Sequence, residues 1–254
     1  MARLELDSVS RRFAGVEAVK NLTMSIAAGR VTGLIGPNGA GKTTVVNLIT
    51  GLLKLSAGRI RLDEREIGEL QPHEVAALGI ARTFQSIRLL KEASVLDNIV
   101  VGFHLRDRSS FAAQALGLPS VRRTRAGLTE QARQLLREFG MVQYAQSLAG
   151  ELSYGHQRRV EIMRALALEP SVLLLDEPVC GMNDAEAAEL GGLFRGFAER
   201  GIAVLVIEHN MQLMMTLCDE LYVLDSGELI AHGSPEQVRT DSKVVEAYLG
   251  VELC

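Results

Sequence analysis

The sequence predicts an α/β fold with a mostly parallel sheet and an inserted helical subdomain. Short apolar runs, rich in β-branched residues or Leu, are typical of strands buried on both faces of a parallel sheet. These runs lie at residues 31–35, 172–176 and 203–208. Helical patterns at 42–50 and 184–199 follow the first two runs, an alternation typical of the α/β class. From about 87 to 165 there is little strand signal beyond an apolar patch at 99–103, which predicts a helical insertion.

Three further segments have recognisable patterns. The opening stretch 4–13 alternates apolar and polar residues, as an edge or antiparallel strand would. Segment 221–233 is typical of a hairpin with Ser226-Gly227 at its turn. Segment 129–142 is amphipathic and predicts a helix that starts at Thr129.

Residues 104–127 form an arginine-rich stretch that also contains Gly, Pro and Ser. Its arginines are Arg106, Arg108, Arg122, Arg123 and Arg125. Two interpretations stay open: a solvated surface insertion, or a contact with an acidic partner or an anionic lipid.

Composition excludes several classes of protein. The 254 residues fit one large domain or two small ones, and the net charge of −4 disfavours a nucleic-acid binder that relies on a basic field. Cys180, Cys218 and Cys254 lack metal-ligand spacing and are expected to be reduced thiols of a cytosolic protein. No apolar run is long enough to span a bilayer, and the opening residues lack the apolar region of a signal peptide.

Gly36–Thr43 fits the phosphate-loop pattern G-x-x-x-x-G-K-[ST] between a predicted strand and a predicted helix. Glycines let backbone N–H groups turn toward phosphate oxygens, and the helix amino terminus adds partial positive charge. Lys42 is expected to reach the β- and γ-phosphates, and the Thr43 hydroxyl to ligate Mg²⁺. The predicted nucleotide-binding residues of this loop are Asn38, Gly39, Ala40, Gly41, Lys42, Thr43 and Thr44. The alternative, a Gly-rich turn with a chance Lys, does not explain the strand and helix on either side.

Two carboxylates end the second apolar run. Asp176 is expected to hold Mg²⁺, and Glu177 to act as the general base on the attacking water. Alone, the pair would equally fit an acidic turn at a strand end. Beside a phosphate loop, it predicts a nucleotide hydrolase.

Residues 152–157, Leu-Ser-Tyr-Gly-His-Gln, open a helical run and resemble the signature motif of ATP-binding cassette (ABC) ATPases. This resemblance implies a P-loop NTPase (RecA-like) core with an antiparallel β subdomain and an inserted helical subdomain. It assigns Phe13 to adenine stacking, Gln85 to Mg²⁺ and water, and His209 to the γ-phosphate. Ser153 and Gly155 would bind the ATP of a second subunit in a head-to-tail dimer. Tyr154, His156 and, in the D-loop at 180–183, Asn183 depart from the usual pattern.

Almost the whole chain resembles the ATP-binding subunits of branched-chain amino acid importers, especially the longer of the two, with relatives for urea or amides and for lipopolysaccharide export as alternatives. The expected core is 1–86 with 166–234, the insertion 87–165, and a helical tail 235–254. Implied partners are a second ATPase subunit (self or paralogue), two membrane-spanning permeases and, indirectly, a binding protein outside the membrane, with no nucleic acid. The chain would lie peripherally at the cytoplasmic face of the membrane.

Residues 85–96 are expected to receive the permeases in an apolar groove with a basic rim; a bland packing role is the alternative. The groove residues are Ile87, Leu89, Leu90 and Val95, and the rim residues are Arg88 and Lys91. Two other function classes remain open: a mechanical ATPase acting outside transport, and a P-loop kinase, against which the signature motif and His209 argue.

Overall fold

The computed structural model describes residues 3–105 and 119–249. It divides the chain into two compact units, one of Met1–Arg82 with Ser171–Cys254 and the other of Thr83–Pro170. The insertion expected at 87–165 lies inside the second unit.

A mainly parallel sheet forms the centre of the first unit, with the strand order β10-β9-β3-β8-β7-β6. Its strands are β3 (Val31–Ile35), β6 (Ile80–Arg82), β7 (Val172–Asp176), β8 (Ala203–Ile207), β9 (Glu220–Asp225) and β10 (Glu228–Gly233). Every residue of β3, β7 and β8 is buried, which explains their continuous apolar runs. The predicted hairpin is β9–β10, and Ser226 and Gly227 both have positive φ at its turn.

An antiparallel sheet with the order β2-β1-β4-β5 belongs to the same unit. Its strands are β1 (Arg3–Phe13), β2 (Val16–Ala27), β4 (Ala57–Leu62) and β5 (Arg65–Glu66). Because β1 pairs with β2 on one side and β4 on the other, the opening segment is antiparallel but not an edge strand.

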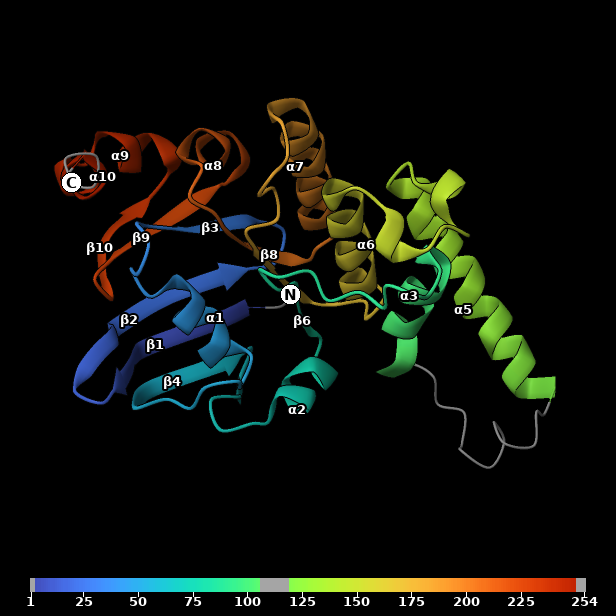
Figure 1. Ribbon diagram of the computed structural model, residues 1–254. Coiled ribbons are helices and arrows are strands. Elements are labelled where there is room, and N and C mark those ends of the chain that lie inside the picture. The colour runs from blue at the N-terminus through green and yellow to red at the C-terminus, as the bar shows by residue number, and fades with distance from the viewer. Residues whose placement is uncertain (1–2, 106–118, 250–254) are drawn as a thin grey trace. The chain divides into compact units, whose positions relative to one another are not determined.

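Helix α1 (Lys42–Ile49) lies between the two sheets of the first unit (Figure 1). Its apolar side chains join those of both sheets in one core. Helices α7 (Asp184–Glu199) and α8 (Met211–Leu217) pack against β3 and the strands beside it on the other face. Helices α2 (Pro72–Ala77), α9 (Pro235–Thr240) and α10 (Ser242–Leu249) flank the sheet at β6 and at β9–β10.

The second unit is helical over its described residues. Its elements are α3 (Val95–Gly102), η1 (Phe103–Leu105), α5 (Pro119–Glu138), η2 (Val142–Tyr144), η3 (Ala149–Glu151) and α6 (Tyr154–Leu166). The apolar patch at 99–103 is therefore helical. The predicted start at Thr129 is wrong, because α5 begins at Pro119 and the Thr129 hydroxyl donates to the Arg125 carbonyl at 2.8 Å inside the helix.

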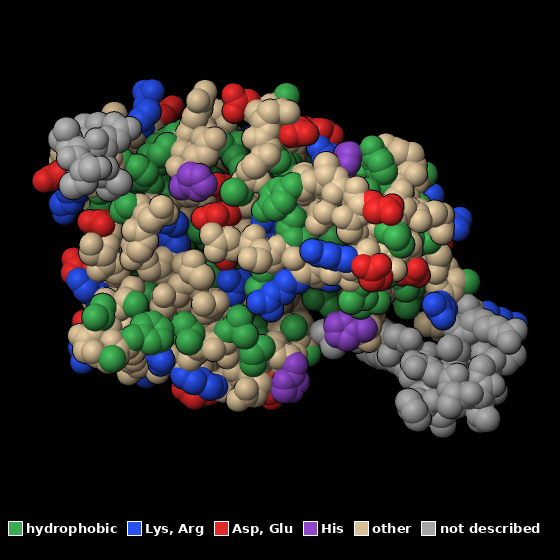
Figure 2. All heavy atoms as spheres, in the orientation of Figure 1, with side chains coloured by type: hydrophobic (Ala, Val, Ile, Leu, Met, Phe, Trp, Pro, Cys, Tyr) green, Lys and Arg blue, Asp and Glu red, His purple; other side chains and the backbone are tan. Residues whose placement is uncertain are grey.

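Arg106, Arg108 and Cys254 lie outside the described residues, whereas Arg123 and Arg125 are exposed on α5. No helix within 3–105 and 119–249 combines the length and apolar character that crossing a membrane requires. On the face shown in Figure 2, acidic and basic side chains are interspersed.

Candidate nucleotide-binding site

The predicted phosphate loop joins β3 to α1, and two of its glycines are required by close backbone contacts. At Gly36, with φ of 151°, an added Cβ would lie 2.1 Å from the Leu224 carbonyl oxygen. At Gly41, with φ of 103°, it would lie 2.5 Å from the Ala18 carbonyl oxygen. Neighbouring strands therefore hold the loop tightly, and side chains at these positions would displace it.

The amino terminus of α1 has no side-chain cap and no acidic residue to neutralise its partial positive charge. Its N-cap residue, Gly41, supplies no side-chain acceptor, and no acidic residue stands in the first turn. The initial N–H groups of a helix lack partners inside the helix and carry partial positive charge. This end of α1 is therefore suited to a phosphate group.

Lys42 is buried, with 8% of its surface exposed, and folds over the loop. Its Nζ donates to the carbonyl oxygens of Gly36 and Pro37 at 2.6 and 2.9 Å. Burial lowers the Lys42 pKa, while the nearby carboxylates of Glu177, Asp176 and Glu208 raise it. The loop, its lysine and the acidic strand ends thus form one electrostatic site.

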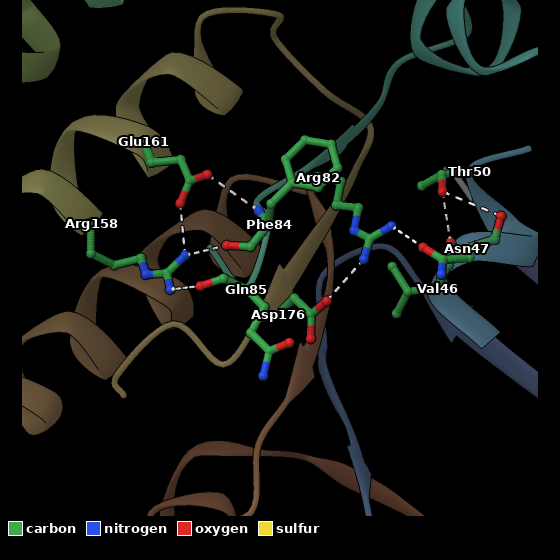
Figure 3. A network of polar contacts seen from close by, with 9 residues as sticks. All are labelled: Val46, Asn47, Thr50, Arg82, Phe84, Gln85, Arg158, Glu161 and Asp176. Carbon is green, nitrogen blue, oxygen red and sulfur yellow. Dashed lines mark hydrogen bonds and ion pairs between the residues drawn. The ribbon is translucent and has the colours of Figure 1, made fainter. Parts of the chain in front are cut away.

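Asp176 ends β7 and is 2% exposed. Its Oδ2 accepts a hydrogen bond from Arg82 Nη2 at 2.9 Å, and Arg82 Nη1 donates to Asn47 Oδ1 at 2.6 Å (Figure 3). Arg82 thereby ties the carboxylate to α1, the helix that follows the phosphate loop. The orientation of Asp176 is fixed by a charge-assisted contact.

Glu177 follows directly and has a left-handed backbone with φ of 48°. For a residue other than glycine this conformation costs about 1–3 kcal/mol, and it recurs at functional sites. The Glu177 N–H donates to the Ile207 carbonyl of β8 at 2.9 Å, which holds the strained residue beside the neighbouring strand end.

The end of β8 supplies His209 and a residue that the sequence analysis missed, Glu208. The His209 side chain is 60% exposed, and its Nδ1 lies 3.6 Å from Glu208 Oε2. Glu208 itself is 1% exposed, and burial raises its pKa. Its signal in the sequence is an acidic residue directly after an apolar run, the same signal that identified Asp176.

The remaining predicted residues of the first unit vary in exposure. Phe13 is 39% exposed at the end of β1, with the Arg11 guanidinium 4.5 Å from its ring centre. Asn38, Gly39 and Thr43 are exposed, Thr44 is half-buried, and Ala40 is buried. Asn183 accepts a hydrogen bond from the Glu186 N–H at 3.0 Å and caps α7.

The predicted residues of the second unit are tied together by Arg158, which is fully buried (Figure 3). Its guanidinium donates to the carbonyl oxygens of Phe84 and Gln85 at 2.5 and 2.8 Å, and to Glu161 Oε2 at 2.7 Å. It also donates to the Tyr154 hydroxyl at 3.1 Å. The unusual Tyr154 of the signature segment therefore belongs to the network that holds the Gln85 backbone.

The signature segment opens α6. Ser153 is its N-cap, accepting a hydrogen bond from the His156 N–H at 3.4 Å, and Gly155 lies in the first turn. The structure places these two residues and Gln85 in the second compact unit, whereas Phe13, the phosphate loop, Asp176, Glu177 and His209 belong to the first.

Segment 85–96 differs in part from the expected groove. Leu90 is 51% exposed and Ile87 and Leu89 are half-buried, but Val95 is fully buried as the first residue of α3. Val95 therefore contributes to the core of the second unit and not to a surface groove. The Arg88 guanidinium lies 4.5 Å from the Phe84 ring centre.

Comparisons with known proteins find related families, chains and structures. The family model described as ABC transporter matches residues 19–180, and that described as branched-chain amino acid ATP-binding cassette transporter matches 228–253. The high-affinity branched-chain amino acid transport ATP-binding protein BraF of Pseudomonas aeruginosa is 40% identical over 97% of both chains. The lipopolysaccharide export system ATP-binding protein LptB of Escherichia coli is 32% identical over 98% of both. A crystal structure of a nucleotide-free ATP-binding cassette from an ABC transporter gives a TM-score of 0.85 at 32% identity, covering 98% of this chain and 99% of that one. The predicted fold class is thereby confirmed.

Lys42→Ala is expected to weaken nucleotide binding by roughly 10- to 100-fold, because one charged donor to phosphate is lost. Titration with a fluorescent ATP analogue measures the affinity. Lys20→Ala removes a lysine paired with Glu228 at 3.0 Å and serves as the control, with unchanged affinity. Equal affinity of Lys42→Ala and the wild type would contradict the assignment of the loop.

Arg158→Met is expected to lower the free energy of unfolding by about 3–5 kcal/mol, because Glu161 and two carbonyl groups lose a buried partner. Urea denaturation measures the loss. Arg137→Met removes the exposed partner of Glu130 in the same unit and is expected to change stability little. If both variants unfolded at the wild-type midpoint, the Arg158 network would not stabilise the unit.

Proposed function

This chain belongs to the ABC transporter family, and from that premise we propose that it is the ATP-hydrolysing subunit of an importer for branched-chain amino acids. The observation that carries the cargo is the match along nearly the whole chain to BraF, together with the separate match of 228–253. The observation that carries the activity is the site itself: an uncapped helix end, a buried lysine and a carboxylate at each of two neighbouring strand ends.

Binding of ATP falls to the phosphate loop. The N–H groups from Asn38 to Thr44 surround the phosphate oxygens, and Lys42 exchanges its carbonyl partners for the β- and γ-phosphates. The exposed Phe13 ring stacks on adenine, a contact that needs an aromatic face and no matched hydrogen bonds.

The residues present suit a magnesium ion, which takes hydroxyl and carboxylate oxygens as ligands. Thr43 offers an exposed hydroxyl at the start of α1, and Asp176 a buried carboxylate whose orientation Arg82 fixes. When bound, the ion would neutralise charge on the phosphates. Gln85 stands in the other compact unit, and its part in holding the ion and the water is proposed on the family resemblance alone.

Hydrolysis needs a general base for the attacking water and a hydrogen-bond donor to the γ-phosphate. We assign Glu177 to the base: its carboxylate accepts the proton of the water whose oxygen attacks the γ-phosphorus, and ADP leaves. His209 donates a hydrogen bond to a γ-phosphate oxygen, and 60% exposure of its side chain leaves the ring accessible to that oxygen. The left-handed backbone of Glu177 fixes where the base emerges from the sheet.

A second subunit completes each site. Ser153 and Gly155 lie at the amino terminus of α6, a second phosphate-binding end. In the proposed head-to-tail dimer they bind the ATP held by the partner, which is self or a paralogue. ATP thereby stabilises the closed dimer over the open one, and hydrolysis reverses the preference.

The dimer is proposed to drive two membrane-spanning permease subunits from the cytoplasmic face of the membrane, fed by a binding protein outside it. Exposed Leu90 and half-buried Ile87 and Leu89 support docking at 85–96. The 32% identity to LptB favours lipopolysaccharide export as the second candidate, with the same ATPase chemistry.

Reconstitution tests the cargo. The chain would be coexpressed with candidate permease subunits and a candidate second ATPase subunit, placed in vesicles and assayed for ATP hydrolysis with loaded binding proteins. Stimulation by a binding protein loaded with Leu, Ile or Val is expected. Stimulation by another solute would change the cargo, and failure to form any complex would favour an ATPase outside transport.

Glu177→Gln is expected to bind ATP with unchanged affinity and to hydrolyse it about 10²- to 10⁴-fold more slowly, because the amide cannot accept the proton. ATP should then trap the dimer, which size-exclusion chromatography would detect. Fast turnover by this variant would remove Glu177 as the base.

Ser153→Arg is expected to spare ATP binding by the isolated subunit and to abolish activity that needs the dimer, because the bulky side chain blocks the second phosphate-binding end. Gln146→Arg adds the same charge at an exposed position of the second unit and is the control. Full activity of Ser153→Arg would show that the signature segment does not complete a site in the partner.

A further inference from the structure

Glu208 connects two segments that leave neighbouring strands. It directly follows β8 and is 1% exposed. Its Oε1 accepts a hydrogen bond from the Val179 N–H at 3.1 Å, and its Oε2 accepts one from the His209 N–H at 3.2 Å. One carboxylate therefore holds the turn after Glu177 with one oxygen and the backbone of His209 with the other.

The Glu208 contacts lie just beyond the last paired residues of β7 and β8. Strands β7 and β8 pair as far as Asp176 and Ile207, and the Glu177 N–H still reaches the Ile207 carbonyl. The segment that follows β7 carries the proposed base, Glu177, and the segment that follows β8 carries the proposed γ-phosphate ligand, His209. Where the backbone hydrogen bonds between β7 and β8 end, the Glu208 carboxylate still connects these two segments.

We propose that Glu208 is a positioning residue for ATP hydrolysis, whose carboxylate fixes the turn after Glu177 and the backbone of His209 in one arrangement. The proposal rests on the proposed function, because it acts through those two residues. The role assigned to Glu208 runs through its hydrogen bonds to the backbone of Val179 and His209.

The chemistry of its contacts favours a positioning role for Glu208 over a role in packing the core. A buried carboxylate is costly, and the nearby Glu177 charge adds to that cost by further raising the Glu208 pKa. An apolar side chain would fill the same space without this penalty. What a carboxylate supplies, and an apolar group cannot, is two acceptor oxygens aimed at two separate backbone donors.

Glu208→Gln is the informative variant, because it keeps the shape but leaves one N–H facing an amide NH₂ group. Turnover per site is expected to fall roughly 10- to 100-fold, the scale of a small misplacement of catalytic groups, while ATP affinity stays within about twofold. Hydrogen exchange measured by mass spectrometry should quicken in peptides containing Val179 and His209, independently of activity.

A double-mutant cycle separates positioning from general loss of structure. In a His209→Ala background, adding Glu208→Gln should lower turnover much less than it does in the wild type, because its effect runs partly through His209. Glu220→Gln, which removes the carboxylate 2.7 Å from His232 in the same unit, is the matched control and should leave turnover unchanged. Glu208→Asp keeps the charge on a shorter arm and provides a second variant if the amide impairs folding.

Three results would overturn the proposal: wild-type turnover in Glu208→Gln, a loss in the double variant equal to the product of the two single losses, or a fall in ATP affinity as large as that in turnover. The proposed function fails separately. If Lys42→Ala keeps its nucleotide affinity, the site assignment is wrong, whereas loss there with normal Glu208→Gln turnover removes only the positioning role.

Discussion

The buried ammonium group of Lys42 is the constraint on which the nucleotide-binding unit depends. A charge at 8% exposure is expensive unless partners surround it. Two loop carbonyls bond it directly, and three carboxylates favour its charged form. The loop can offer those carbonyls only because Gly36 and Gly41 pass against neighbouring backbone where a Cβ would not fit. The loop conformation that surrounds the Lys42 ammonium group is therefore also the one that the proposed phosphate binding requires.

The parallel sheet explains why the carboxylates are available. Strands β3, β7 and β8 run in one direction, so their carboxyl ends meet at one edge. That edge receives the phosphate loop from β3, Asp176 and Glu177 from β7, and Glu208 and His209 from β8. Strands β7 and β8 are apolar up to their carboxyl ends, and the carboxylates of Asp176 and Glu208 stand at those ends while still buried. The site is therefore a direct consequence of the strand order.

The sequence predicts those features that depend on local pattern. Continuous apolar runs located β3, β7 and β8, fixed spacing located the phosphate loop, and a carboxylate at the end of an apolar run located Asp176. Sequence patterns do not predict features that depend on tertiary contacts. The alternation in 4–13 cannot distinguish an edge strand from one flanked on both sides, and Val95 appears as surface until α3 buries it. Glu208 stands at the end of an apolar run, as Asp176 does, but its contacts with Val179 and His209 are tertiary and cannot be read from that run.

Two arginines brace the chain on either side of the boundary between the compact units. Arg82, the last residue of β6, holds Asp176 and Asn47 within the first unit. Arg158 holds the carbonyls of Phe84 and Gln85 within the second. Only Thr83, itself fully buried, separates the two braced segments. Within each unit, a charged donor in buried surroundings therefore fixes one predicted functional residue: the Asp176 carboxylate in the first unit and the Gln85 backbone in the second. The departure at Tyr154 follows the same logic, because its hydroxyl accepts from the guanidinium that anchors Gln85.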